Sequence, residues 1–146
     1  MFKVGIIGAG WIAEKMVQAL APLKDYCVYA IASRSLEKAE EFAGKWNIPK
    51  AYGSYEDMVK DKDIDLVYIA TPHSHHYPHT MLAIEHGKHV LVEKAFTANA
   101  REAEILLKAA KEKGVFITEA IWTRYMPLSH KVREIMESGI IGEPRI

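Results

Sequence analysis

A glycine-rich turn near the N-terminus constrains this chain more than any other feature of its sequence. The apolar run 3–7 predicts a β-strand, and a helical pattern of apolar residues follows from Gly10 to Leu20. The segment at their junction is Gly8-Ala9-Gly10-Trp11-Ile12-Ala13, which matches the pattern G-x-G-x-x-G/A. Because it joins a strand to a helix, this segment predicts a loop that binds the pyrophosphate of a dinucleotide.

The residue types in this turn suit that task. Gly8 permits a tight turn, and Gly10 lets the backbone approach a phosphate with no side chain between them. Ala13 is small enough for the helix to pack closely on a sheet. The free N–H groups at the start of the helix attract a phosphate group. We therefore expect cofactor contacts from Gly8, Gly10, Trp11 and Ile12.

The rest of the chain alternates strands and helices. Five more apolar runs of strand length occur, and segments with helical periodicity separate them. The strands are apolar nearly throughout, as strands covered on both faces are. This order predicts a Rossmann-type α/β fold, a doubly wound parallel sheet with strand order 3-2-1-4-5-6. The expected strands are 3–7, 26–32, 51–52, 65–70, 89–92 and 115–118, and the expected helices are 10–20, 36–45, one opened by Ser54, 76–85 and 99–113.

Composition narrows the classes of function. The 146 residues suffice for one domain with a substantial core. The 19 basic residues balance 19 acidic ones, which argues against nucleic acid or an anionic membrane as a partner. The single cysteine, Cys27, cannot form an internal disulfide, and no segment resembles a signal peptide or a membrane span. These features predict a cytoplasmic protein.

The end of the second predicted strand indicates which dinucleotide the loop binds. An NAD enzyme usually carries Asp or Glu there for the ribose hydroxyls. Here the sequence is Ala32-Ser33-Arg34-Ser35, and the first acid is Glu37. Ser33 and Arg34 can hold a ribose 2′-phosphate, and Arg34 can also stack on the adenine. We predict NADP(H) rather than NAD(H); an exposed arginine that simply begins a loop is the alternative.

The end of the chain departs from the alternating pattern. A helical stretch reaches Ser138, and the segment 139–146 resembles a turn that leads into another strand. Such a strand has no partner in this sequence. We therefore expect a nucleotide-binding domain at 1–124, and a connector with the start of a truncated second domain at 125–146.

Three motifs in this order resemble one family of oxidoreductases. They are the glycine turn 8–10, the segment Ala70-Thr71-Pro72-His73-Ser74-His75-His76, and the segment Gly87-Lys88-His89-Val90-Leu91-Val92-Glu93-Lys94. Together they resemble the glucose–fructose oxidoreductase/inositol dehydrogenase (Gfo/Idh/MocA) family over nearly the whole chain. The segment 119–127 looks most like the dimeric dihydrodiol dehydrogenase branch, which includes NADP-dependent xylose dehydrogenases. The resemblance implies hydride transfer between NADP(H) and a sugar or trans-dihydrodiol, by a full-length protein that is a homo-oligomer.

The resemblance assigns the catalytic role to Lys94. In the family, the lysine of a Glu-Lys-Pro motif lies by the nicotinamide and assists proton transfer, and Glu93 and Lys94 occupy the matching positions. A free lysine titrates near ~10.4, so this role requires burial or cationic neighbours that lower its pKa. The family's proline, often preceded by a cis bond, is replaced by Ala95. Because a cis bond to another residue type costs about 2.5–4 kcal/mol, we expect a trans bond here.

The resemblance also assigns residues to the rest of the cofactor site. The family motif Thr-Pro-Asn-x-x-His corresponds to 71–76, which would place Thr71 and Pro72 near the ribose and nicotinamide and make His76 the motif histidine. His73 replaces the usual asparagine, as in the dihydrodiol branch. The nicotinamide end of the cleft would be walled by Glu119, Trp122 and Arg124. Packing within an interdomain linker is an equal alternative for Trp122.

Two other functions compete with this interpretation. His73, His75, His76 and His79 are close enough in sequence to suggest zinc, but no cysteine lies nearby and the first acid after these histidines is Glu85, so we expect no metal. The second alternative is a non-catalytic NADP-binding module or sensor. The family's substrate site needs a second domain that covers the nicotinamide. We therefore expect the chain alone to bind cofactor without efficient turnover.

Overall fold

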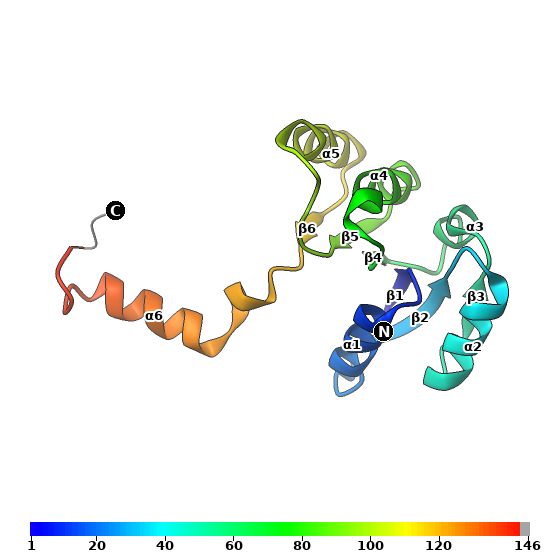
Figure 1. Ribbon diagram of the computed structural model, residues 1–146, viewed down its shortest axis with the longest axis horizontal. Helices are drawn as coiled ribbons and strands as arrows, with labels where there is room; N and C mark the ends of the chain where they lie inside the picture. The colour runs from blue at the N-terminus through cyan, green and yellow to red at the C-terminus, as the bar shows by residue number, and fades with distance from the viewer. Residues whose placement is uncertain (144–146) are drawn as a thin grey trace.

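Six parallel strands form one sheet in the order β3-β2-β1-β4-β5-β6 (Figure 1). The structure is a computed structural model that describes residues 1–143. Every neighbouring pair of strands is parallel, so the predicted Rossmann-type fold and its strand order are confirmed. The strands are β1 (Phe2–Ile7), β2 (Tyr26–Ala32), β3 (Lys50–Tyr52), β4 (Leu66–Ile69), β5 (His89–Val92) and β6 (Ile117–Glu119).

Two hydrophobic cores lie on opposite faces of this sheet. One contains buried residues of the first two helices, and the other contains buried residues of the next three α-helices. Successive residues of a strand point to opposite faces, so Val67 and Ile69 of β4 join one core while Tyr68 joins the other. The helices that cover the sheet are α1 (Trp11–Leu20), α2 (Leu36–Trp46), α3 (Tyr55–Val59), α4 (His76–Glu85) and α5 (Ala100–Lys113), and a 3-10 turn, η1 (His73–His75), precedes α4.

Polar side chains set where several helices begin. The Ser35 hydroxyl accepts a hydrogen bond from the Lys38 amide at the start of α2. Ser54 caps α3 in the same way, and the Asn99 side chain caps α5. Gly114 ends α5 with a φ of 68°, a left-handed conformation that favours glycine. These caps agree with the helix starts and the helix end expected from the sequence.

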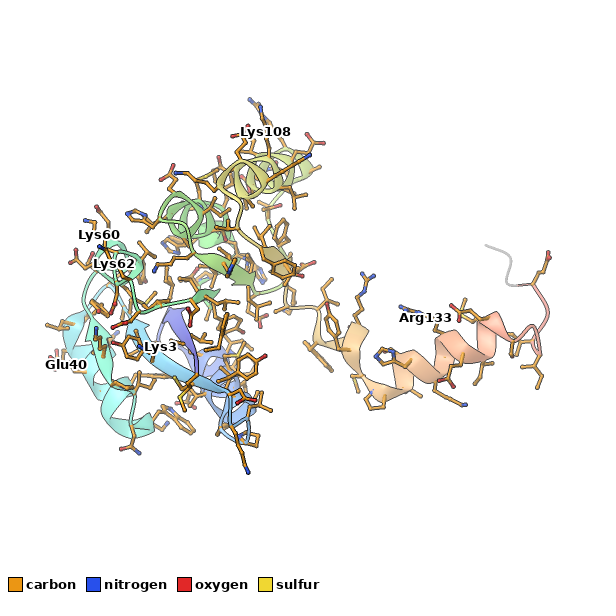
Figure 2. The ribbon with its side chains drawn as sticks, turned by 180° about the vertical axis from the view of Figure 1, so that it is seen from behind. Lys3, Glu40, Lys60, Lys62, Lys108 and Arg133 are labelled. Carbon is orange, nitrogen blue, oxygen red and sulfur yellow. The ribbon has the colours of Figure 1, made fainter. Side chains whose placement is uncertain are left out.

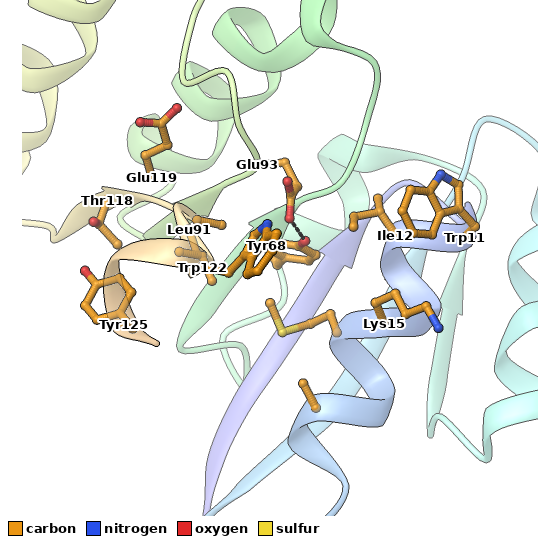
Figure 3. A pocket seen from close by; sticks show the side chains of 13 residues that line it. Trp11, Ile12, Lys15, Tyr68, Leu91, Glu93, Thr118, Glu119, Trp122 and Tyr125 are labelled. Carbon is orange, nitrogen blue, oxygen red and sulfur yellow. Dashed lines mark hydrogen bonds between the residues drawn. The ribbon is translucent and has the colours of Figure 1, made fainter. Parts of the chain in front are cut away.

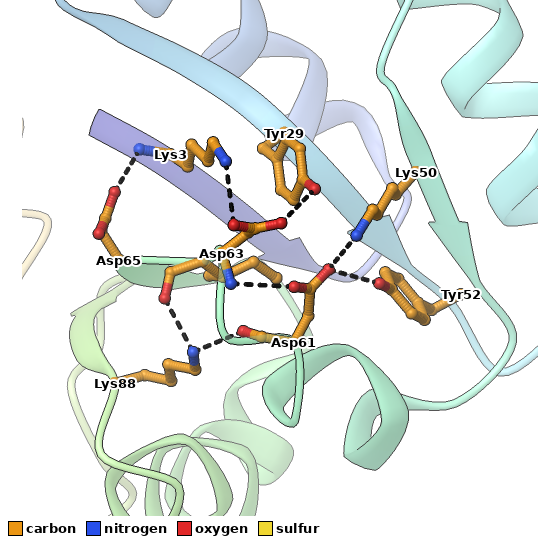
Figure 4. A network of polar contacts seen from close by, with 9 residues as sticks. Lys3, Tyr29, Lys50, Tyr52, Asp61, Asp63, Asp65 and Lys88 are labelled. Carbon is orange, nitrogen blue, oxygen red and sulfur yellow. Dashed lines mark hydrogen bonds and ion pairs between the residues drawn. The ribbon is translucent and has the colours of Figure 1, made fainter. Parts of the chain in front are cut away.

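A network of ion pairs and hydrogen bonds joins the amino ends of the strands (Figure 4). The Asp61 carboxylate accepts hydrogen bonds from the Lys50 ammonium and the Tyr52 hydroxyl, each at 2.7 Å. The buried Lys88 ammonium donates to the carbonyl oxygens of Asp61 and Ile64, at 2.6 and 2.8 Å. Burial lowers the pKa of Lys88. This network fixes the loop before β4.

The C-terminal segment extends away from the sheet. A 3-10 turn, η2 (Trp122–Tyr125), leads into α6 (Pro127–Glu137), which lies apart from the sheet (Figures 1 and 2). Every residue of α6 except Ser129 is exposed. The expected helical stretch is therefore present, whereas the strand expected at the last residues lies outside the described part of the chain. Among residues 1–143, no helix is both long and apolar enough to cross a membrane.

Candidate functional site

The glycine turn lies at the carboxyl end of β1, in the middle of the sheet. Gly8 has a φ of 104°, and a Cβ at this position would lie 2.8 Å from the carbonyl oxygen of Ala70. Only glycine fits this approach between neighbouring strand ends. A Cβ at Gly10 would meet no atom within 4 Å, so the space beside this residue is open among the described residues. The turn thus has the close packing and the open approach that a phosphate loop requires.

A polar cavity of about 270 Å³ lies on one side of the turn. Ser33 and Arg34 reach it from the end of β2, and Lys38 reaches it from the first turn of α2. No lining residue within the described part of the chain is acidic, so the cavity suits an anionic ligand. Its lining residues are Gly8, Ala9, Gly10, Ser33, Arg34, Lys38, Tyr55, Ala70, Thr71, Pro72, His75 and His79.

A second cavity, of about 540 Å³, lies on the other side of the turn. It brings together residues that the sequence analysis assigned to one site from four separate segments. Lys94 lies at its edge with an exposed side chain, so the burial expected of a catalytic lysine is not supplied by residues 1–143. Its lining residues are Trp11, Ile12, Thr71, Pro72, His73, His76, Glu93, Lys94 and Trp122.

His76 is fully buried between the two strand ends that form this cavity. Its Nδ1 atom lies 2.6 Å from the carbonyl oxygen of Ala95, and its Nε2 atom lies 2.8 Å from the carbonyl oxygen of Thr71. Both partners are acceptors, so both hydrogen bonds form together when both ring nitrogens carry protons. The ring therefore ties the end of β4 to the segment that follows Lys94.

The peptide bond between Lys94 and Ala95 is cis, so the expectation of a trans bond is wrong. That expectation considered the two residues by themselves, whereas tertiary contacts hold the backbone that follows. The Ala95 carbonyl oxygen accepts from His76, and the Phe96 amide donates to the Glu119 carboxylate at 2.7 Å. The segment after the lysine is thus held without the family's proline.

Sequence reasoning missed Tyr68, which lies beneath Glu93 (Figure 3). Its hydroxyl donates to one carboxylate oxygen of Glu93, and the Lys94 amide donates to the other at 3.2 Å. Burial and the adjacent carboxylate raise the pKa of Tyr68. Tyr68 occurs within an apolar strand, where the sequence predicts a core side chain. Its hydroxyl is the one feature of that strand that could have indicated a polar contact.

A third cavity, of about 600 Å³, lies over the sheet between α1 and η2 (Figure 3). Its walls are mainly apolar, with Tyr68 and Leu91 as its floor. Trp122 lines both the second and the third cavity. Of the three cavities, Glu119 lines only the third. Arg124 lies in η2, exposed and outside all three cavities. The structure therefore places Trp122 in the same cavity as Lys94, whereas Arg124 does not line that cavity.

The crowded histidines do not gather into a recognisable metal site. Within residues 1–143, no group of three or more His, Cys, Asp or Glu side chains has the arrangement of a metal-binding cluster. His76 bonds to backbone carbonyls, and the Nδ1 atom of His79 lies 3.1 Å from the Thr71 hydroxyl. Burial lowers the pKa of His79 to about 4, and the nearby His75, His76 and Arg34 add to this effect.

The described residues fit a dinucleotide. The space beside Gly10 is open, and no side chain of residues 1–143 caps the start of α1, which leaves its N–H groups available to a phosphate. The polar cavity lies on one side of this point, and the cavity with Lys94 lies on the other. This arrangement provides a place for each half of a dinucleotide.

Comparison with known proteins agrees with this geometry. Residues 2–120 match the model of the Gfo/Idh/MocA oxidoreductase family, described as having an NAD-binding Rossmann fold. The chain is 44% identical to trans-1,2-dihydrobenzene-1,2-diol dehydrogenase from Mus musculus, over 97% of this chain and 43% of that protein. It is 45% identical to an NADP⁺-dependent D-xylose 1-dehydrogenase from Hypocrea jecorina, over 96% of this chain and 39% of that protein.

A solved structure shows the same arrangement of elements. A 3-ketoreductase from Actinomadura kijaniata, crystallised with TDP-benzene and NADP, superposes with a TM-score of 0.90 and 31% identity. The superposition covers 97% of this chain and 45% of the reductase. The chain therefore spans less than half the length of these relatives. The family match and the identities above show that the chain belongs to the Gfo/Idh/MocA oxidoreductase family and forms its NAD-binding Rossmann fold.

Proposed function

We propose that this chain binds NADP(H) and belongs to an enzyme that transfers hydride to or from a sugar or a trans-dihydrodiol. One observation carries the proposal: Lys94 lines the same cavity as Trp11 and Ile12, which follow the glycine turn. A proton-transferring side chain and a phosphate-binding helix start thus meet at one place. The relatives support the choice of cofactor and substrate, because one is an NADP⁺-dependent xylose dehydrogenase and another acts on a dihydrodiol.

In this proposal the two halves of the cofactor lie on either side of the glycine turn. The pyrophosphate lies at Gly8, Gly10 and the start of α1, where N–H groups are available. The adenosine half occupies the polar cavity, where Ser33 and Arg34 bind the 2′-phosphate. The nicotinamide half occupies the cavity of about 540 Å³, lined by Thr71, Pro72, His76, Glu93, Lys94 and Trp122.

The nicotinamide supplies the carbon that accepts or donates hydride when the cofactor is bound. Lys94 then takes the proton of the substrate hydroxyl during oxidation and returns it during reduction. His76 and Glu119 are positioning residues, because both hold the backbone that follows Lys94. The exposed Lys94 side chain requires cover from substrate and from further protein to work in a site that excludes water.

Other features of the whole protein stay predictions. We propose that 1–124 forms the nucleotide-binding domain and that 125–146 connects it to a substrate domain. The exposed α6 supports this division, because its apolar side chains Leu128 and Val132 are 68% and 48% exposed. The contribution of Arg124 to cofactor binding, the homo-oligomeric state and the cytoplasmic location also stay predictions.

An activity assay tests the proposed function. The full-length protein is incubated with NADP⁺ and either D-xylose or trans-1,2-dihydrobenzene-1,2-diol, and NADPH formation is followed by absorbance. We expect turnover with at least one of these two substrate classes. If the protein binds NADPH but oxidises neither substrate and reduces neither matching carbonyl, the proposed enzymatic role is wrong and a non-catalytic NADP-binding module replaces it.

A further inference from the structure

We propose that His75, packed beside His79, contacts the 2′-phosphate of NADP(H) when its ring is protonated. The preference of the protein for NADP(H) over NAD(H) then increases as the pH falls toward slightly acidic values. The inference rests on the proposed dinucleotide binding and adds a second, proton-dependent element to the 2′-phosphate site.

The polar cavity brings cationic groups together from two walls. Arg34 and Lys38 line it from the β2 side, and His75 and His79 line it from the segment that follows β4. No carboxylate among the described residues lines this cavity to neutralise a charge on either histidine. A dianionic phosphate bound here therefore stabilises the charged form of a nearby imidazole.

The contacts of the two rings leave one nitrogen of each ring available. The Nδ1 atom of His75 lies 3.0 Å from the Ser74 hydroxyl, and the Nδ1 atom of His79 lies 3.1 Å from the Thr71 hydroxyl. The ring centroids of His75 and His79 are 5.5 Å apart, and the His79 ring also packs edge-on against Tyr55 at 4.6 Å. Among hydrogen bonds of the described residues, Nε2 of each ring is without a partner and can donate to a ligand.

Burial distinguishes the two rings. His79 is half-buried, and burial lowers its pKa to about 4, assisted by His75, His76 and Arg34. His75 is exposed to solvent, so a charge on its ring avoids the desolvation that a charge on the His79 ring would meet. The neutral His79 ring then supports a charged neighbour without repelling it. Around the pair, the titratable or charged groups are Arg34, Lys38, Tyr55, His73 and His76.

NADH provides the internal control for this proposal, because it lacks the 2′-phosphate and shares the rest of NADPH. The second pKa of a phosphate monoester lies near ~6, so the 2′-phosphate stays mainly dianionic above about pH 6.5. Histidine is the side chain that changes charge between about pH 5 and 8. A change in cofactor preference between about pH 8.5 and 6.5 therefore reports on a histidine beside the 2′-phosphate.

The experiment measures the dissociation constants of NADPH and NADH across this range for the parent protein, for His75→Gln and for His130→Gln. His130 is an exposed histidine of α6 outside the polar cavity, and serves as the matched control. In the parent and in His130→Gln, the ratio of the NADH constant to the NADPH constant should increase about three- to fivefold as the pH falls, as for an exposed charge pair. In His75→Gln the ratio should stay constant with pH.

Three results would overturn the proposal. A ratio that does not change with pH in the parent shows that no proton is linked to the 2′-phosphate. An equal pH dependence for both cofactors places the proton at the pyrophosphate. An undiminished pH dependence in His75→Gln assigns the proton to another group. If neither cofactor binds to folded protein at any pH, the proposed function itself is wrong, and that result is distinct from the first three.

Discussion

At the residue scale, the surroundings of Lys94 combine an exposed side chain with a tightly held backbone. Its amide donates to the Glu93 carboxylate, which Tyr68 also contacts. Two residues further on, the Phe96 amide donates to Glu119. The lysine thus has a defined backbone position while its ammonium group stays free to reach a substrate. This combination suits a group that must exchange a proton with a bound molecule.

Replacement of Lys94 separates catalysis from cofactor binding. In the active full-length enzyme, Lys94→Ala should lower kcat by about 10²–10⁴-fold, the usual contribution of general acid–base catalysis. The dissociation constant of NADPH should change little, because the phosphates bind elsewhere. Lys94→Arg keeps the positive charge but cannot release its proton, so it should be about as impaired. Full activity of Lys94→Arg would contradict a proton-transfer role.

Replacement of Arg34 tests the choice of dinucleotide. Arg34→Ala should weaken NADPH binding by about 1.5–3 kcal/mol, as expected for the loss of a hydrogen bond to a charged group. NADH binding should barely change, because NADH has no 2′-phosphate. Arg101→Ala, at an exposed position of α5 far along the chain, is the matched control. Equal weakening of both cofactors would refute the 2′-phosphate role of Arg34.

The sequence predicted the site residues that belong to a local pattern and missed those that tertiary structure brings in. The glycine turn and Ser33-Arg34 follow strand ends, so chain order alone located them. Lys38 lies on a helix, where a lysine side chain is ordinarily interpreted as solvated. Tyr68 lies within an apolar strand, where a tyrosine side chain is ordinarily interpreted as part of the core. Their places in the cavities depend on how the neighbouring elements pack.

At the element scale, the largest difference between expectation and structure concerns the sixth strand. It was expected at 115–118 and is found at Ile117–Glu119. The Val115 amide donates to the Ala110 carbonyl oxygen, so Val115 caps the end of α5 instead of pairing in the sheet. The Phe116 amide donates to the His89 ring. Apolar character identified the strand, but such capping contacts, which set its first residue, are invisible in the sequence.

The ion-pair network at the amino ends of the strands should make stability depend on acid pH. Burial opposes ionisation of Asp61, but hydrogen bonds from Lys50 and Tyr52 outweigh it and lower its pKa to about 2. The folded-state pKa is thus below the ordinary value of 3.8, so the stabilisation is present above about pH 4 and disappears as the pH falls toward 2. Asp61→Asn should lower the free energy of unfolding near neutral pH by about 1–3 kcal/mol.

Urea unfolding of the parent and of Asp61→Asn at a series of pH values checks this prediction. The difference in unfolding free energy should shrink steadily below about pH 4. Asp57→Asn, at an exposed residue of α3, serves as the control, and its difference from the parent should be small throughout. A difference for Asp61→Asn that is the same at every pH would show that the carboxylate charge is not the stabilising feature.

Helix α6 should be far less stable than the helices that pack on the sheet. It has 11 residues, and short helices without tertiary packing are marginal in water. By contrast, α5 has 14 residues and buries Leu106 and Ala110. In the 146-residue chain, hydrogen exchange should be fast in α6 and slow in the core of α5. Equal protection of both helices would mean that α6 packs on another surface.

At the scale of the whole molecule, one half of the sheet is better covered than the other. On the face of α1 and α2, an apolar cavity of about 600 Å³ remains over β4, β5 and β6. The relatives are more than twice as long as this chain. The fold class and strand order could be predicted from alternating segments, because the topology rules leave few alternatives. The open cavity on this face and the exposure of Lys94 could not, because they depend on how elements far apart in the sequence pack together.

Dinucleotide binding is the central claim, and a direct titration tests it. The protein is titrated with NADPH and with NADH, and the intrinsic fluorescence of its tryptophans is recorded, since Trp11 and Trp122 line the cavity that contains Lys94. A Gly10→Val variant is the control: a Cβ at this position meets no atom within 4 Å, so the fold should persist while the phosphate approach is blocked. We predict that NADPH binds at least about tenfold more tightly than NADH, a difference of about 1.4 kcal/mol, and that Gly10→Val binds neither. Folded parent protein that binds neither dinucleotide, or a Gly10→Val variant that binds as well as the parent, would contradict the account.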